Sequence, residues 1–337
     1  MEETISLAHG NGGRLTTKLI KDVFLKAFSN RRLANLDDGA LLEWGAGNLV
    51  FTTDSYVIQP IFFPGGDIGR LAVCGTVNDL AVMGARPLCL SAGFIIEEGL
   101  PIATLQRIVS SMREALSSVQ AELVTGDTKV VEKGKADGIY INTAGLGLVE
   151  SAISFQAKLI KPGDQIILSG SLGDHAAAVM CARQEYPLNL SVTSDVAPLW
   201  PLVEEIFRRA GSKDIRIMRD PTRGGLATLL NDLCVAAGFS CIIEEARLPV
   251  KDEVRVLCEL TGFDPLYLAN EGKLVLVCDK AVTQSILAVM KSHPLGREAA
   301  LLGEFIEDTK ARLFCRSQAG GERIVDPLVY DMLPRIC

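Results

Sequence analysis

Several signatures of common protein classes are missing from this sequence of 337 residues. Aromatic residues make up only 6%, and no apolar run free of charge or glycine reaches the ~18 residues of a membrane-spanning helix. The first ten residues, MEETISLAHG, contain two acids and lack the apolar segment of a signal peptide. These absences predict a cytoplasmic protein that does not engage a membrane.

Blocks of basic residues are also missing. The chain has 34 Lys and Arg against 41 Asp and Glu, which gives a net charge of −7. No RNA-recognition or helix-turn-helix signature is present, so the sequence argues against nucleic acid as the main partner. A mildly acidic protein that binds phosphate groups needs a bridging cation or local backbone amides to do so.

Disulfide and zinc motifs are absent as well. The nine cysteines form no C-x-x-C and mostly lie in apolar runs such as VLVCDK, which is typical of small buried side chains. The three histidines are isolated, with no HExxH, so a His-ligated zinc enzyme is not expected. Cys337 differs because it is the last residue, where its thiol could be a reachable nucleophile. From the residues alone, a terminal cysteine without a role is the simpler interpretation.

What the sequence does contain is typical of an α/β protein. Nearly half of the residues are hydrophobic and 31 are glycines, which suits many tight strand-to-helix turns. The length favours two domains, and we expect them at residues 1–155 and 156–322. Residues 323–337 hold two prolines and no sustained period, so we expect a flexible tail. From Asp326 to Cys337 this tail could span ~40 Å at ~3.3 Å per residue.

Hydrophobic periodicity places the main elements. It predicts helices from Asp67 to Met83, over residues 101–118 and over residues 198–210. The run AELVTGDTKVV is predicted to be a strand that enters a loop at Gly126 and Asp127. The runs LLGEFI and ARLFCR are predicted to form a final strand pair.

A set of aspartates beside glycine or other small residues is the first candidate functional feature. Hard cations such as Mg²⁺ take oxygen ligands, usually one or two carboxylates together with substrate phosphates. A single aspartate of this kind is more often a helix cap or turn residue, whereas the whole set favours metal ions held against a triphosphate. We expect its members at the ends of strands or helices; they are Asp37, Asp38, Asp54, Asp79 (after Asn78), Asp127 and Asp220.

Glycine-rich turns and two charged residues complete the candidates. The turns HGNGG (9–13), GSLG (170–173) and PTRGG (221–225) could present backbone N–H groups to an anion. None is a Walker A loop or a GxGxxG fingerprint, so each alone is also compatible with an ordinary turn. Lys129 could neutralise phosphate charge, and Glu271 precedes a hydrophobic strand, where loop carboxylates are often functional. A solvated surface charge is an equal alternative for both.

Taken together, these motifs resemble the HypE family of hydrogenase maturation proteins. These are carbamoyl dehydratases of the PurM-like, aminoimidazole-ribonucleotide-synthetase superfamily. The resemblance covers the whole chain, and the cysteine-ended tail is its most specific feature. It rests on the segments HGNGG (9–13), DDGA (37–40), TTD (52–54), VNDLAVMGA (77–85), GDTKV (126–130), DPTRGGL (220–226), NEG (270–272) and PRIC (334–337).

This resemblance implies a fold and a set of site residues. The fold is α/β (α+β), with an N-terminal domain that forms a dimeric β-barrel and a C-terminal α/β domain, and ATP with Mg²⁺ lies between the two. Metal ligation is implied for Asp38, Asp54, Asp79, Asp127 and Asp220. Nucleotide binding is implied for Gly12, Gly13, Asp37, Asp38, Asp54, Asn78, Asp79, Asp127, Arg223 and Gly224.

The resemblance also implies chemistry and partners. A carbamoyltransferase, HypF, would load a carbamoyl group onto the Cys337 thiol, and ATP would drive its dehydration to thiocyanate. Either Glu271 or Lys129 would be the base. The HypC–HypD complex would accept the cyanide as a ligand for the iron of [NiFe]-hydrogenase. The alternatives are another enzyme of the superfamily, such as selenophosphate synthetase or thiamine-monophosphate kinase, or a scaffold that binds nucleotide without catalysis.

Overall fold

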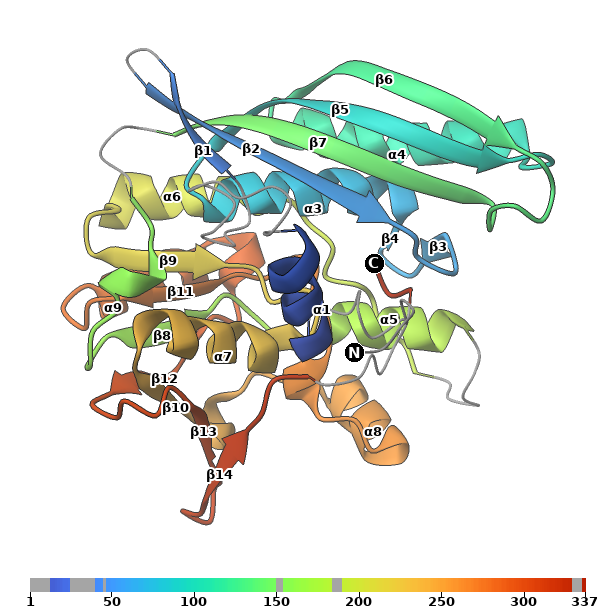
Figure 1. Cartoon of the computed structure of the whole chain (residues 1–337). Coiled ribbons are helices and arrows are strands. Elements are labelled where there is room, and N and C mark those ends of the chain that lie inside the picture. The colour runs from blue at the N-terminus through green and yellow to red at the C-terminus, as the bar shows by residue number, and fades with distance from the viewer. Residues whose placement is uncertain (1–12, 25–39, 45–46, 150–153, 184–189, 329–334) are drawn as a thin grey trace.

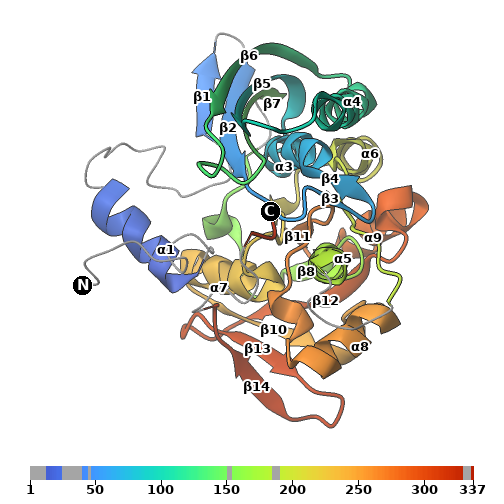
Figure 2. The ribbon, with the colours of Figure 1, turned by 90° about the vertical axis from the view of Figure 1, so that its right-hand side faces the viewer.

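The computed structural model describes residues 13–24, 40–44, 47–149, 154–183, 190–328 and 335–337. Two mixed layers of strand and helix lie one above the other in Figures 1 and 2, and the last residues of the chain lie between them. In the described part of the chain, no helix is long and apolar enough to cross a membrane.

The N-terminal half contains a five-stranded sheet in the order β1-β2-β7-β5-β6. Only the β5–β6 pair is parallel. Two helices, α3 and α4, lie on one side of it (Figure 2), and a short hairpin, β3–β4, leads into α3. The elements are β1 (Ala40–Trp44), β2 (Gly47–Tyr56), β3 (Phe62–Phe63), β4 (Gly66–Asp67), α3 (Ile68–Val82), β5 (Arg86–Glu97), α4 (Ile102–Ser118), β6 (Glu122–Val131) and β7 (Ile139–Val149). Within the described residues this sheet is open, with β1 and β6 at its edges.

The C-terminal half contains a seven-stranded sheet in the order β14-β13-β10-β12-β8-β11-β9. Its strands are β8 (Gln165–Leu168), β9 (Ile215–Arg219), β10 (Ser240–Glu244), β11 (Val275–Cys278), β12 (Ala300–Ile306), β13 (Leu313–Arg316) and β14 (Glu322–Val325). The accompanying helices are α5 (Asp174–Arg183), α6 (Trp200–Ala210), α7 (Gly225–Ala237), α8 (Asp252–Thr261) and α9 (Thr283–Ser292), and α1 (Arg14–Leu19) lies beside α7. Strands β8 and β11, near its centre, are buried at every residue.

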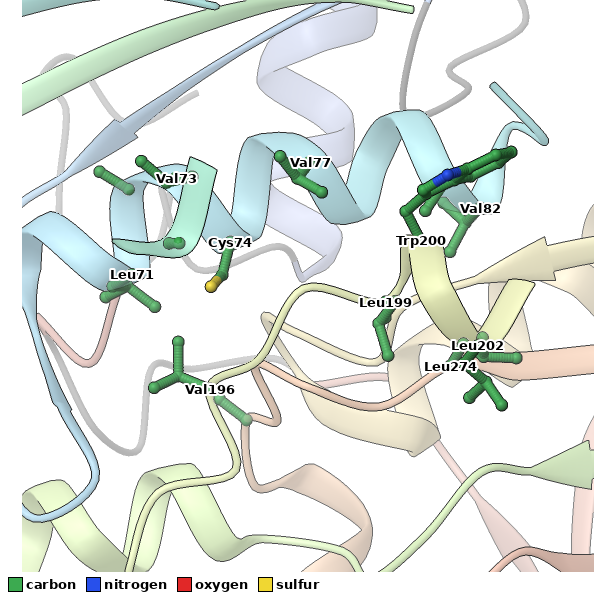
Figure 3. Packing of buried hydrophobic residues seen from close by; sticks show 14 of the residues in the cluster. Leu71, Val73, Cys74, Val77, Val82, Val196, Leu199, Trp200, Leu202 and Leu274 are labelled. Atoms are coloured by element: carbon green, nitrogen blue, oxygen red, sulfur yellow. The ribbon is translucent and has the colours of Figure 1, made fainter. Parts of the chain in front are cut away.

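Helix α3 is the link between the two halves. It begins where Asp67 accepts hydrogen bonds from the backbone of Gly69 and Arg70, which satisfies donors that a helix start leaves unpaired. Its residues are buried almost without exception. Figure 3 shows Val73, Cys74 and Val77 of α3 in one cluster with Leu199 and Trp200 from the start of α6. The two halves therefore share a hydrophobic core, which fixes the relative position of the residues that line their boundary.

The expected helices are confirmed, but three predictions about where elements end or which strands pair are wrong. Gly126 and Asp127 lie inside β6, which continues unbroken to Val131, because the parallel pairing with β5 holds them in a strand. Asp54 and Asp79 likewise lie within β2 and α3, not at their ends. The last prediction fails because β12 and β13 are not neighbours: each pairs with β10, which lies between them.

Candidate functional site

The end of the chain is held between the two halves of the molecule. We call residues 335–337 the tail end. The backbone N–H of Val57 donates to the carbonyl of Cys337 at 3.3 Å, and that of Gln59 donates to Arg335 at 3.2 Å, so the tail end pairs with the segment that follows β2. Between them, Ile336 is 8% exposed and belongs to the shared core. Cys337 is therefore positioned at the boundary between the halves.

Arg223 is a charged group close enough to Cys337 for the two to interact electrostatically. Burial alone would lower the pKa of Arg223, yet the negative charges of Cys337, Asp54 and Glu271 raise it. Its Nη2 lies 3.6 Å from Oδ1 of Asp54. Arg223 thus stays cationic and connects the end of the chain to two carboxyl groups.

Asp54 is oriented from β2 by a neighbour on the same strand. The hydroxyl of Tyr56 donates to its Oδ2 at 3.1 Å, which the two-residue spacing on one face of a strand allows. Burial raises the pKa of Asp54, although Arg223 and Tyr56 both oppose the rise. Close packing fixes Tyr56 in turn, because a Cβ on Gly75 of α3 would lie 2.2 Å from its hydroxyl oxygen.

Glu271 is a strongly perturbed carboxyl group at this boundary. It is 3% exposed, and its Oε1 has no hydrogen-bond partner among the described residues. Burial first, and then the charges of Asp220, Asp195 and Asp54, raise the pKa of Glu271 well above its usual value, while Arg223 opposes them. A buried carboxyl group with an unused oxygen has the properties expected of a proton acceptor in a closed site.

The backbone around Glu271 is fixed from both sides. Its N–H donates to Oδ1 of Asp195 at 3.1 Å, and its carbonyl accepts from Nδ2 of Asn78 at 3.0 Å. Asp195 is itself paired with Lys273 at 3.0 Å, where both side chains are buried. Gly272 has no room for a side chain, since a Cβ would lie 1.8 Å from the carbonyl oxygen of Asp195. These contacts hold the backbone that carries the Glu271 side chain in one place.

Asn78 and Asp79 on α3 are both engaged by the protein. Besides Glu271, the Asn78 amide binds the carbonyl of Ala197 and the N–H of Leu199, so it joins α3 to the C-terminal half. Asp79 accepts a hydrogen bond of 2.6 Å from the Thr52 hydroxyl of β2. The structure therefore places these two predicted ligands beside the site, with Asn78 in a tethering position.

Lys129 and Asp127 lie elsewhere in the chain. Both are exposed on the edge strand β6, with Nζ of Lys129 3.7 Å from Oδ2 of Asp127. In register, Asp54 lies opposite Thr143, then Ala92, then Gly126, so three strand spacings of ~4.8 Å separate β2 from β6. Because side chains alternate, Asp127 and Lys129 point to the face of the sheet opposite Asp54. A single chain does not bring them to Glu271.

Gly13, of the first glycine-rich motif, and Gly224, of the third, are both linked to Thr228 of α7. Gly13 precedes α1, and the next N–H, of Arg14, donates to the carbonyl of Leu328, whose own N–H donates to the Thr228 hydroxyl. Gly224 packs on the same Thr228 with a left-handed φ of 73°, a conformation that favours glycine. Gly12, Asp37, Asp38 and His9 lie outside the described residues.

The donor set suits a magnesium-bound triphosphate. Among the residues that the structure describes, no group of three or more His, Cys, Asp or Glu side chains could hold a metal ion by itself. Mg²⁺ usually takes only one or two carboxylates and completes its shell with water and phosphate oxygens. The charges of Asp220 and Asp54 both raise the pKa of Glu271, and a bound cation would relieve such repulsion.

Three residues of the site were not predicted from the sequence. Tyr56, Asp195 and His175 are buried and bond to Asp54, to Glu271 and to the tail end, respectively. The spacing of Tyr56 from Asp54 was the only available signal. The other two depend on contacts between residues far apart in the chain.

Comparison with known families agrees with the fold. The family described as AIR synthase related protein, N-terminal domain, matches residues 36–149, and the corresponding C-terminal domain matches residues 161–316. The molecule is thus a two-domain protein of the AIR synthase related class. The matched ranges do not test the exact bounds 1–155 and 156–322, which stay a prediction.

Relatives that match over nearly the whole chain identify a more specific family within this class. The carbamoyl dehydratase HypE of Cupriavidus necator is 47% identical over 334 residues, covering 99% of this chain and 95% of the relative. A HypE–HypF complex has a TM-score of 0.87 at 45% identity, over 92% of this chain and 99% of the other. A hydrogenase maturation protein HypE in complex with ATP has a TM-score of 0.82 at 43% identity, over 99% and 100%. The chain belongs to the HypE family of carbamoyl dehydratases, and the resemblance seen in the sequence is confirmed.

Proposed function

We propose that this chain dehydrates a carbamoyl group carried on Sγ of its own Cys337 to a thiocyanate. The C–O bond of the carboxamide breaks, the oxygen leaves with phosphate, the nitrogen loses two protons, and a C≡N bond forms. ATP is converted to ADP and phosphate, and the released phosphate contains the oxygen of the carboxamide. The observation that carries the proposal is the docked tail end, which sets Cys337 against Arg223 beside a buried, partnerless Glu271 oxygen.

The roles of the chain's own residues follow from their contacts. Bound ATP with Mg²⁺ would supply the phosphoryl group that turns the carboxamide oxygen into a leaving group. Asp54 and Asp220 would hold the metal ion, and Asp79, next to Thr52, would support it. Arg223 offsets negative charge that develops at the reacting group. Burial at the boundary excludes water, which protects the product from hydrolysis.

Glu271 is the base that the structure of one chain favours over Lys129. Its raised pKa makes the ionised carboxylate a stronger proton acceptor than an exposed glutamate, although a smaller fraction is ionised at neutral pH. Lys129 is on the opposite face of the sheet, with its side chain 74% exposed. Of the two candidate bases, Glu271 is the one whose charge acts on Arg223 together with that of Cys337.

A second copy of the chain would give Lys129 and Asp127 a role. The face of the N-terminal sheet away from α3 exposes Phe51, Ile95 and Leu148, each at least 40% accessible, and the edge strand β6 exposes Val124 and Val130. An open edge and apolar face of this kind favour pairing with another sheet. We infer a homodimer built through this face, in which Asp127 and Lys129 of one copy are presented to the other.

The groups carried on Cys337 indicate which partner proteins the chain needs. A thiol at the end of the chain can be loaded only after the tail end leaves the boundary between the halves. The relative solved as a HypE–HypF complex supports the carbamoyltransferase HypF as the donor. The cyanide would pass to iron on a HypC–HypD complex in the cytoplasm, which again requires the tail end outside.

The test is ATP turnover by protein that has been carbamoylated on Cys337. Carbamoylated chain should release about one phosphate per loaded thiol, whereas unloaded chain and Cys337→Ala should release almost none. Cys89→Ala is the matched control, since that cysteine also lies partly exposed but in β5. Equal phosphate release by Cys337→Ala and the unmutated chain, after the same treatment, would rule the proposal out and favour a nucleotide-binding scaffold or another enzyme of the superfamily.

A further inference from the structure

Side chains of helix α5 form hydrogen bonds with the backbone carbonyls of the tail end. Nε2 of His175 lies 2.7 Å from the carbonyl oxygen of Ile336, and Nη2 of Arg183 donates to the carbonyl of Arg335 at 2.7 Å. Nε of Arg183 also donates to Gln59 at 2.8 Å, so one guanidinium bonds to the tail end and to the residue that pairs with it. With the N–H groups of Val57 and Gln59, every carbonyl of the last three residues is bonded.

His175 is set as a donor before the tail end arrives. A carbonyl oxygen can only accept, so Nε2 must carry the proton. Burial lowers the pKa of His175, which leaves the ring neutral and makes Nδ1 an acceptor for the Ser194 hydroxyl at 2.8 Å. The ring of Phe63 packs edge-on against it at 5.3 Å between centroids. Because Ser194 and Phe63 belong to other segments, the ring keeps this orientation without help from the tail.

The contacts of His175 and Arg183 do not involve the side chain of Cys337. Both residues bond to main-chain oxygens, one and two positions before the cysteine. The strength of this attachment is therefore independent of whether Sγ carries a hydrogen, a carbamoyl group or a cyano group. These two contacts therefore do not distinguish substrate from free thiol, and their release depends on thermal opening or on competition by a partner.

We propose that His175 and Arg183 form a latch that positions the tail end for dehydration and limits how often Cys337, which is only partly exposed when docked, becomes fully exposed. They are positioning residues, since neither touches the reacting atoms. This inference rests on the proposed function, because the latch matters only if Cys337 must be both docked and released. It assigns α5 a role in the timing of the reaction cycle and not in its chemistry.

The test is the rate at which a bulky maleimide–polyethylene glycol modifies Cys337, followed as loss of the unmodified C-terminal peptide in mass spectra. Loss of one hydrogen bond from a charged donor should raise the open fraction, and with it the labelling rate of Arg183→Ala, by roughly tenfold. His175→Leu should behave similarly, whereas His175→Gln, which keeps an N–H donor, should stay near the unmutated rate. Arg208→Ala, an exposed arginine on α6, is the matched control.

Several results would overturn the latch. Unchanged Cys337 labelling in both Arg183→Ala and His175→Leu would do so, and faster labelling of Cys89 as well would show general loosening instead. If His175→Gln labels as fast as His175→Leu, packing explains the effect and His175 is not a donor that matters.

A second readout separates this inference from the proposed function. Single-turnover dehydration of carbamoylated chain should slow in Arg183→Ala, with the concentration dependence on ATP unchanged. If labelling accelerates as expected but the carbamoylated, unmutated chain never dehydrates with ATP, the latch stands and the proposed function fails. If the carbamoylated, unmutated chain dehydrates but Cys337 of the variants is labelled at the unmutated rate, the proposed function stands and the latch fails.

Discussion

At the scale of single residues, Glu271 is a buried carboxyl group whose protonation decides what it can do. The sequence marked it as a candidate together with Asp54 and Arg223, and the structure brings these three together. It could not show that Lys129 lies on the opposite face of a sheet, because strand register sets that distance. Nor could it show that the Asn78 amide forms hydrogen bonds with three backbone groups, since those groups belong to the other half of the molecule.

The first prediction concerns the pH dependence of stability. The pKa of Glu271 is raised in the folded chain, whereas the unfolded carboxyl has a pKa of about 4.3. The folded state therefore holds the proton more tightly, so this stability is present below about pH 4.3 and is lost as pH rises through the folded-state pKa. Glu271→Gln should remove this loss. Urea unfolding at a series of pH values measures it, and identical slopes for both proteins would contradict the assignment.

The same substitution should abolish the chemistry. Without a base, the dehydration rate of carbamoylated Glu271→Gln should fall by roughly 100-fold or more. In the unmutated chain the rate should rise with pH through the pKa of Glu271. Lys129→Met serves as the comparison within the same assay. If Lys129→Met loses activity while Glu271→Gln keeps it, the base is Lys129.

At the scale of elements, periodicity predicted α4 and α6 well because their buried faces recur every three to four residues. It failed at β6, where Gly126 and Asp127 resemble a turn until the pairing with β5 is known. Long-range pairing also explains why β10 lies between β12 and β13. The tail end shows the same limit: the run Pro334 to Cys337 resembles an unstructured end, but its final residues pair with the segment after β2.

The start of α3 offers a stability test at this scale. Asp67 caps the helix through two backbone N–H groups and accepts from the Ser111 hydroxyl of α4 at 2.6 Å. Asp67→Ala should lower the free energy of unfolding by about 2 kcal/mol, at the upper end for a helix cap, because these donors are left buried. Asp252→Ala, an exposed acid in the first turn of α8, should change it by less than about 0.5 kcal/mol. Denaturant titration compares the two, and equal effects would refute the role of the cap.

The turn after Glu271 offers a second stability test. Gly272→Ala forces a Cβ against the carbonyl of Asp195 and should displace the Glu271 backbone, so both stability and dehydration should be lost together. Gly321→Ala is the control, since its nearest neighbour would be 3.5 Å away. Thermal unfolding measures the stability of both variants, and the dehydration assay measures their activity. A Gly272→Ala protein as stable and active as Gly321→Ala would show that the backbone there is not tightly held.

At the scale of the whole molecule, two α/β domains could be predicted from length and glycine-rich turns. Their shared core could not, because it depends on α3 being buried from both sides. The exposed apolar face of the N-terminal sheet predicts a dimer. Ile95→Asp should produce a folded monomer by analytical ultracentrifugation, whereas Val235→Asp on α7 should leave a dimer. A monomeric unmutated chain would contradict the proposed assembly and leave Lys129 without a site.

The most direct measurement of the central claim is the mass of the C-terminal peptide after incubation of the chain with HypF, carbamoyl phosphate and ATP. The account predicts a carbamoyl adduct on Cys337 that becomes lighter by one water only when the chain's own site has ATP and Glu271. An adduct that keeps its full mass under these conditions, in protein shown to bind ATP, would contradict it.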